Sequence, residues 1–215
     1  ETFSSKNVGT TMVDRSQGTY FAPDALKGRT FEVNQADLNT GSNSQAYRKF
    51  KFIVDGVKGK DAHSSFYGME LISDKIKSIP RKWHSLIEAE TKVETNDGYI
   101  LRVFTICTTK RKSKSTKKYV YANLADIKKI RKIIFKIIEK HLSNCSINEV
   151  INKLMNETIG TSIEHEGSKI YLINNCHVKK VKIIKRPKVD ESKYDTKLKS
   201  KKVEVIDVVD EVTTN

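Results

Sequence analysis

The amino-acid sequence predicts an α+β fold, with antiparallel strands in its first half and helices in its second. Three observations lead to this prediction. Apolar and polar side chains alternate before residue 109, an apolar repeat of helical period spans residues 123–142, and alternation returns at residues 178–185. The chain has 215 residues, enough to bury a substantial core. We expect one globular domain over residues 1–188 and a charged, extended surface tail over residues 189–215.

The first predicted strand covers residues 47–54. Its alternation places Phe50 and Phe52 on one face and lysines on the other. Asp55 and Gly56 follow directly, and this dipeptide is typical of a turn. We therefore expect the strand to end at residue 54.

A hairpin is predicted next. Residues 87–93 alternate between apolar or small side chains and charged ones. Residues 96–98 read Asn-Asp-Gly, and these residue types tolerate the positive φ of a tight turn. The return strand, residues 99–108, is apolar on both faces apart from Arg102. That pattern indicates a central, covered strand.

The longest predicted helix is amphipathic and covers residues 123–142. Plotted at 100° per residue, its apolar residues fall on an arc of about 200°. They are Leu124, Ile127, Ile130, Ile133, Ile134, Phe135, Ile137 and Ile138. Lysines occupy the opposite side of the helix.

Three shorter helices are predicted as well. Residues 73–82 form one candidate, interrupted by Pro80. Residues 146–149 read Ser-Ile-Asn-Glu, a capping-box pattern that opens a helix reaching about residue 155. Residues 161–164 suggest the start of a third short helix.

The composition is strongly basic. Lysine and arginine number 40 against 26 acidic residues, which gives a formal net charge of +14. This charge points to nucleic acid, an anionic membrane surface or an acidic protein as the partner. The sequence contains no run of eighteen apolar residues and no signal-peptide pattern, which argues against a membrane-spanning or secreted protein. Three dispersed cysteines without a Cys-x-x-Cys pair favour reduced thiols.

Catalytic chemistry finds no support in the sequence. The five histidines are dispersed and form no metal-binding motif. Residues 56–60 read Gly-Val-Lys-Gly-Lys, but they fail the spacing of a phosphate-binding loop, and a hairpin turn with a lysine rim explains them better. We therefore expect no enzymatic activity, no cofactor, and no catalytic, cofactor-binding or metal-binding residues.

Basic residues gather in three clusters, which are the candidate RNA-binding residues. The first is the loop at residues 110–118, which has six cations, no acid and no apolar side chain. The candidates are Lys110, Arg111, Lys112, Lys114, Lys117 and Lys118 in this loop, Lys128, Lys129, Lys132 and Lys136 on the long helix, and Lys179, Lys180, Lys182, Lys185, Arg186 and Lys188 along the last strand. For each helix lysine, a solvated face is as good an interpretation as an RNA contact. Tyr119 and Tyr121 either stack on unpaired bases or face the core, and the sequence leaves both open.

Several segments resemble one family in chain order. They read Arg-Ser-Gln-Gly-Thr at residues 15–19, Leu-Lys-Gly-Arg-Thr-Phe-Glu-Val at 26–33, Tyr-Arg-Lys-Phe-Lys at 47–51, Phe-Tyr-Gly-Met at 66–69, Thr-Asn-Asp-Gly-Tyr at 95–99, and Val-Lys-Lys-Val-Lys-Ile-Ile-Lys-Arg-Pro-Lys at 178–188. Together they resemble the eukaryotic and archaeal small-subunit ribosomal protein family called S-three-a, or e-S-one.

This resemblance implies an antiparallel β-barrel-like core flanked by helices. It also implies a structural constituent of the small ribosomal subunit, a ribonucleoprotein, that binds folded rRNA on the platform near the mRNA exit and supports translation. The implied partners are small-subunit rRNA, neighbouring ribosomal proteins, translation initiation factor three and exiting mRNA, with no membrane. The implied location is the cytoplasmic ribosome, with a nucleolar stage during assembly. The alternative is a free nucleic-acid-binding factor of low sequence specificity.

Overall fold

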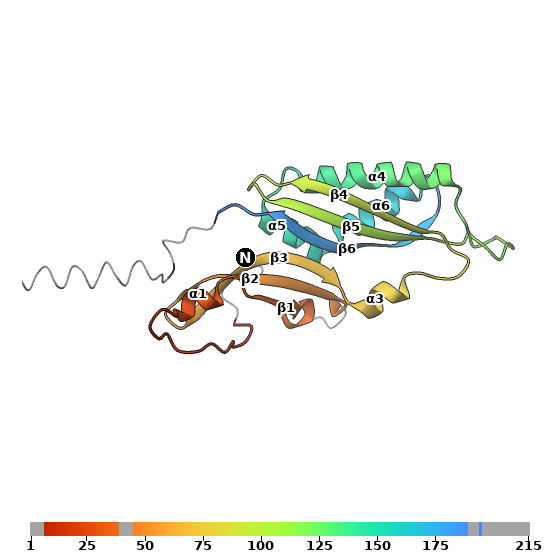
Figure 1. Ribbon diagram of the computed structural model, residues 1–215. Helices are drawn as coiled ribbons and strands as arrows, with labels where there is room; N and C mark the ends of the chain where they lie inside the picture. Colours follow the sequence, from red (N-terminus) through yellow and green to blue (C-terminus); the bar gives the residue numbers. More distant parts are fainter. Residues whose placement is uncertain (1–6, 39–44, 189–193, 195–215) are drawn as a thin grey trace, which may run out of the picture. The chain divides into compact units, whose positions relative to one another are not determined.

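The fold is α+β, as the sequence predicts. We describe it from a computed structural model, for residues 7–38, 45–188 and 194 (Figure 1). Within these residues the strands form one open antiparallel sheet in the order β1-β2-β3-β6-β5-β4. The strands are β1 (Thr30–Asn34), β2 (Arg48–Lys58), β3 (Asp61–Leu71), β4 (Leu86–Glu94), β5 (Ile100–Thr109) and β6 (Ile173–Lys185). The helices are α1 (Ala22–Leu26), α2 (Gln35–Leu38), α3 (Ser73–Ser78), α4 (Leu124–Leu142), α5 (Ile147–Met155) and α6 (Thr158–Gly167).

The described residues group into two compact units. The first unit contains Val33–Phe50 and Tyr67–Pro187, and the second contains Asn7–Glu32, Lys51–Phe66 and Lys188. Strands β1, β2 and β3 therefore contribute residues to both units. Beyond Pro187 the structure describes only Lys188 and Tyr194. The extended tail expected over residues 189–215 therefore stays a prediction.

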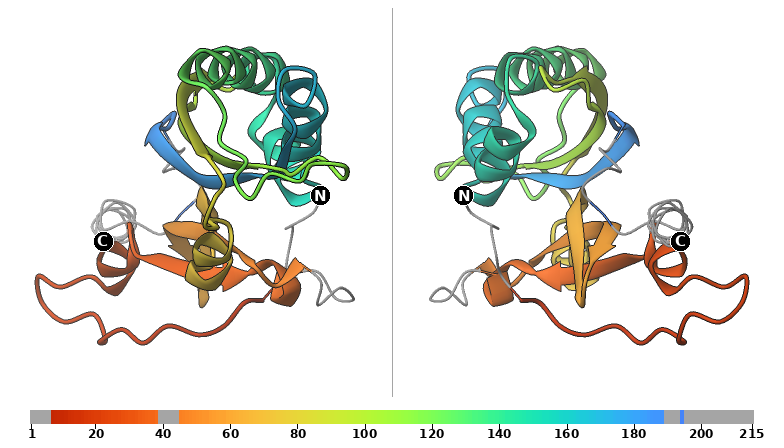
Figure 2. Two further views of the ribbon diagram at one scale, coloured as in Figure 1. Left: turned by 90° about the vertical axis from the view of Figure 1, so that its right-hand side faces the viewer. Right: turned by 90° about the vertical axis from the view of Figure 1, so that its left-hand side faces the viewer.

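In the first unit, α4, α5 and α6 cover one face of β4, β5 and β6 (Figures 1 and 2). Helix α4 packs against β4 and α6, and α6 packs against β6. The side chains between these layers form an apolar core, which includes Ile87, Val93, Leu101, Val103, Ile130, Ile134, Ile138, Val150, Ile159 and Val181. Burial of this apolar surface is the main source of the unit's stability.

The predicted hairpin is confirmed. Gly98 has φ +78°, and its N–H donates to Thr95 O at 3.0 Å, which closes the turn between β4 and β5. Strand β5 is central, because it pairs with β4 on one side and β6 on the other. Helices α4, α5 and α6 cover one of its faces. On the other face Ile106 is buried in a cluster with Leu71 and Ile79, against which Ile76 of α3 packs, whereas Arg102 is exposed.

The predicted turn at Asp55 and Gly56 is wrong. Strand β2 continues to Lys58, and the chain turns at Gly59, which has φ +63°. Asp55 is buried within the strand, and a Cβ at Gly56 would collide with the ring of Tyr194. Glycine is therefore needed here for a close approach of side chain to backbone, not for a turn.

Helix α4 is confirmed, although its buried stripe is narrower than the predicted apolar arc. Ile130, Ile134 and Ile138 are fully buried, whereas Leu124 is 78 % exposed and Phe135 is also exposed. No helix in the described part of the chain has both the length and the hydropathy that crossing a bilayer requires.

The shorter helices differ from prediction mainly at their ends. Helix α5 begins as predicted, with the Ser146 hydroxyl accepting from Glu149 N–H at 3.4 Å. Helix α3 ends at Ser78, before Pro80, because proline lacks an N–H and restricts the residue that precedes it. Helix α6 begins at Thr158, earlier than residue 161, after Glu157 adopts a left-handed φ of +55°.

The second unit is built around the outer part of β2. Gly28 N–H donates to Val54 O at 2.8 Å, and Val54 N–H donates to Arg29 O at 2.9 Å. The Phe31 and Phe52 rings stack with centroids 5.6 Å apart. These contacts fix the segment after α1 against β2.

Candidate nucleic-acid interface

The basic loop, residues 110–118, leaves the end of β5 and extends past the strands toward α4 (Figure 1, green). Hydrogen bonds close its base. Thr109 Oγ1 donates to Val120 O at 2.7 Å and accepts from Ser85 N–H at 2.9 Å. His84 Nδ1 lies 2.5 Å from Thr109 O. The two ends of the loop are therefore held together by the segment that precedes β4.

All six cations of the basic loop are exposed. The Arg111 guanidinium donates to Lys117 O, and Lys118 Nζ lies 4.7 Å from the centroid of the Trp83 ring. Among the described residues, no salt bridge joins a cation of this loop to an acidic side chain. The loop thus presents uncompensated positive charge on an ordered base, which is the electrostatic requirement for a polyanion.

The helix lysines share one exposed face of α4. Lys128, Lys129, Lys132 and Lys136 are all exposed. Lys129 Nζ lies 3.8 Å from Asp126 Oδ1, at the surface, where such a pair contributes little. Helix α4 starts six residues after the basic loop, so these lysines follow the loop closely along the chain.

The third basic cluster is partly neutralised within the protein. Lys179 pairs with Glu88 and Lys180 with Glu70, each at 3.0 Å. Lys182 Nζ lies 5.8 Å from the Phe104 ring centroid. Lys185 and Arg186 follow at the end of β6, and Lys188 is exposed in the second unit. An RNA phosphate would have to compete with carboxylates for two of these lysines.

The register of the sheet separates the third cluster from the basic loop. Thr109, next to the loop, pairs with Ile173, whereas Ile100 at the other end of β5 pairs with Lys185. Nine residues of strand separate these positions, about 30 Å at the usual rise. Lys180 is nearer the loop, because it pairs with Phe104, five residues or about 17 Å from Thr109. The third cluster therefore runs away from the basic loop along β6, and RNA binding by all three clusters stays a prediction.

Three exposed aromatic rings lie beside the basic loop. Tyr119 and Tyr121 are each 54 % exposed, so the interpretation that they face the core is wrong. Their rings stack at 6.0 Å between centroids and 19° between planes. Trp83 is 45 % exposed. Its place beside the loop was not predicted from the sequence, because its segment lies far from the loop along the chain.

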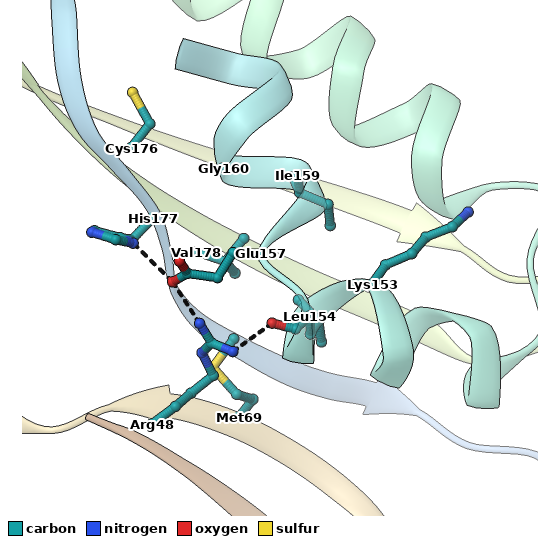
Figure 3. Close-up of a pocket in the computed structure, with 10 residues that line it drawn as sticks. All are labelled: Arg48, Met69, Lys153, Leu154, Glu157, Ile159, Gly160, Cys176, His177 and Val178. Carbon is teal, nitrogen blue, oxygen red and sulfur yellow. Dashed lines mark hydrogen bonds and ion pairs between the residues drawn. The ribbon is translucent and has the colours of Figure 1, made fainter. Parts of the chain in front are cut away.

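A pocket in the first unit contains a buried ionic network (Figure 3). Arg48 is 2 % exposed, and its guanidinium donates to Leu154 O at 2.7 Å and Met155 O at 2.9 Å. It also pairs with Glu157 Oε1 at 2.5 Å, and the same oxygen lies 3.0 Å from His177 Nδ1. Arg48 thus satisfies carbonyls at the carboxyl end of α5, where a positive charge also complements the helix dipole.

The network shifts the pKa of two of its members. Burial alone would raise the pKa of the Glu157 carboxyl, but hydrogen bonds with His177 and Tyr47 and the charge of Arg48 outweigh it and lower this pKa from 4.5 to about 2. Burial, together with the hydrogen bond to Glu157, raises the pKa of Tyr47 to about 12. The geometry indicates a structural role, because each charge is used to hold neighbouring backbone and side chains.

The lowered pKa of Glu157 makes stability depend on pH. The unfolded chain binds the Glu157 proton near pH 4.5 and the folded chain only near pH 2, so stability should fall as the pH drops through this range. Glu157→Gln cannot ionise and should lose the stability that the Glu157 carboxylate contributes above this pH range. Urea unfolding at several pH values should show the difference in stability between wild type and variant shrinking toward pH 2. A difference that is constant with pH would contradict the assignment.

Metal-dependent chemistry gains no support from the geometry. Within the described residues, no group of three or more His, Cys, Asp or Glu side chains is arranged to hold a metal ion. The pocket at Arg48 is lined mainly by apolar side chains and by groups that already bond one another.

Comparison with known families gives one result. The model of the Ribosomal S3Ae family matches residues 1–187. This match covers most of the 215 residues and includes the basic loop, α4 and β6. It confirms the family that the sequence motifs resemble.

Proposed function

Because the chain belongs to the Ribosomal S3Ae family, it is a ribosomal protein of the small subunit, and we propose that it holds folded rRNA mainly through the basic loop. The observation that carries this proposal is the set of six exposed cations on a hydrogen-bonded base. The lysine face of α4 follows the basic loop closely along the chain, and the paired lysines of β6 contribute less.

The expected chemistry is phosphate neutralisation. Each lysine or arginine that contacts a phosphate releases condensed counterions, so binding sums over contacts and weakens as salt rises. Such contacts fix position and orientation on the RNA backbone without reading bases. A protein of this kind suits an RNA whose shape is already set, as in a ribosomal subunit.

The proposal extends to the surroundings of the protein. The family resemblance supports a place on the platform near the mRNA exit, beside other ribosomal proteins, with docking of translation initiation factor three. It also supports assembly into the small subunit in the nucleolus, followed by translation in the cytoplasm. The proposed role is structural and includes no catalytic step.

Sedimentation separates this proposal from a free nucleic-acid-binding factor. A constituent of the subunit should remain at one copy per small subunit in gradients whose salt removes proteins held by phosphate contacts alone, because shape and protein neighbours add to its binding. Quantification by mass spectrometry across low-salt and high-salt gradients measures this. Recovery mainly in the free fraction would refute the ribosomal role and favour the free factor.

A further inference from the structure

Trp83, Tyr119 and Tyr121 form an exposed aromatic cluster beside the basic loop, which we call the aromatic tip. We propose that the aromatic tip stacks on unpaired bases of RNA whose phosphates the basic loop holds. This inference rests on the proposed function and deepens it, because it names unpaired nucleotides rather than duplex as the ligand of this end of the molecule.

The exposed rings of the aromatic tip suggest a binding surface. Large aromatic rings normally bury their apolar area in a core or an interface. Here Trp83 is 45 % exposed and both tyrosines are 54 % exposed, although all three belong to an ordered part of the first unit. Although the two tyrosine rings stack on each other and Lys118 lies over Trp83, about half of each side chain stays exposed and can contact a ligand.

The backbone beneath the rings is fixed. Val120 N–H donates to Trp83 O at 2.8 Å, and His84 forms an isolated parallel bridge with Val120. Val120 itself is buried, so the extended backbone turns both flanking tyrosines outward. The rings are therefore held in place before any ligand arrives, which lowers the entropy lost on binding.

Trp83 is also held in an unusual backbone conformation. Its φ is +67°, a left-handed value that is uncommon for a bulky residue. Strained positions of this kind persist where the surroundings enforce them, and they cluster at functional sites. The hydrogen bond from Val120 supplies the constraint.

Cations surround the aromatic tip. Lys118 Nζ lies 4.7 Å from the Trp83 ring centroid, and Arg81 and Lys82 directly before Trp83 are exposed. Rings for bases together with cations for phosphates are the combination that binds single strands. An A-form duplex keeps its bases stacked inside and offers these rings no base face. The arrangement therefore favours unpaired nucleotides.

Trp83 is the single tryptophan of the chain, so its fluorescence reports on this site alone. The full chain should be titrated with an unstructured RNA of about twelve nucleotides and with a duplex of equal length, each end-labelled for anisotropy. Both RNAs should bind through the basic loop. Only the single strand should quench Trp83.

Leucine variants supply a second readout. Tyr119→Leu and Tyr121→Leu should each weaken single-strand binding by about fivefold or more, the effect of losing one stacked base, and leave duplex affinity within about twofold. Tyr119→Phe keeps the ring and should bind as wild type. Tyr20→Leu, at an exposed tyrosine of the second unit, is the matched control and should change neither affinity.

The outcomes separate the two proposals. If both RNAs bind but quench Trp83 equally or not at all, the stacking inference is wrong while phosphate binding by the basic loop stands. If neither RNA binds, both proposals fail, and an acidic protein becomes the partner that this end of the molecule fits. The fluorescence comparison needs no variant, so misfolding of a variant cannot decide the result.

Discussion

Arg48→Met should lower the free energy of unfolding by on the order of 3–5 kcal/mol, the usual effect of removing one partner from a buried ion pair. Arg48 donates to two carbonyls at the end of α5, to Gln35 Oε1 at 2.9 Å and to Glu157. Methionine fills a similar volume but donates no hydrogen bond. The variant therefore removes the charged donor from Glu157 and from the carbonyls at the end of α5.

Arg102→Met is the matched control for this prediction. Arg102 Nε pairs with Glu90 Oε1 at 3.1 Å, but both side chains are about half exposed. Surface pairs of this kind contribute about 1 kcal/mol or less. Urea unfolding of both variants should show a large loss for Arg48 and a small one for Arg102. Equal losses would contradict the structural role assigned to the buried network.

Replacing Lys110, Arg111, Lys112 and Lys114 by alanine should weaken binding to small-subunit rRNA and flatten its dependence on salt. Each lost phosphate contact removes about 0.7–0.9 from the slope of log affinity against log salt concentration, so four contacts would remove about three. The exposed side chains carry no core packing, so the free energy of unfolding should stay unchanged. Filter binding at several salt concentrations measures the slope.

A charge-matched control separates position from net charge. Lys112→Ala with Lys114→Ala and Lys58→Ala with Lys60→Ala each remove two exposed lysines, the first pair from the basic loop and the second from the β2–β3 turn. Only the first pair should reduce affinity and slope. Equal effects would show that binding depends on overall charge rather than on the loop.

Local signals in the sequence predicted much of the fold. Three local signals act within a few residues: the alternation in β4, the Asn-Asp-Gly turn at residues 96–98 and the Ser146 cap of α5. Each of these elements can therefore be predicted from its own short stretch of sequence. The wrong turn prediction at Asp55 and Gly56 has a non-local cause. The Tyr194 ring packs against the backbone at Gly56 and leaves no room for a side chain, and this contact joins residues far apart in the chain.

The candidate site was predictable in charge but not in geometry. Six cations without an acid identify the basic loop directly. By contrast, the pairing of Lys179 with Glu88 depends on how β6 lies beside its neighbours. The position of Trp83 likewise depends on a backbone hydrogen bond from Val120, which no periodicity in either segment indicates. Alternation places Arg48 on the same strand face as Phe50 and Phe52. Its carbonyl and carboxylate partners lie more than one hundred residues later, so no local pattern identifies them.

A map of protein–rRNA crosslinks in intact small subunits tests directly whether the basic loop is the main rRNA contact. We expect rRNA nucleotides to crosslink to residues 110–118 and to the aromatic tip, with weaker crosslinks at Lys179 and Lys180. Crosslinks from residues 110–118 only to proteins, while other segments of the chain crosslink to rRNA, would contradict the basic loop as the main rRNA contact.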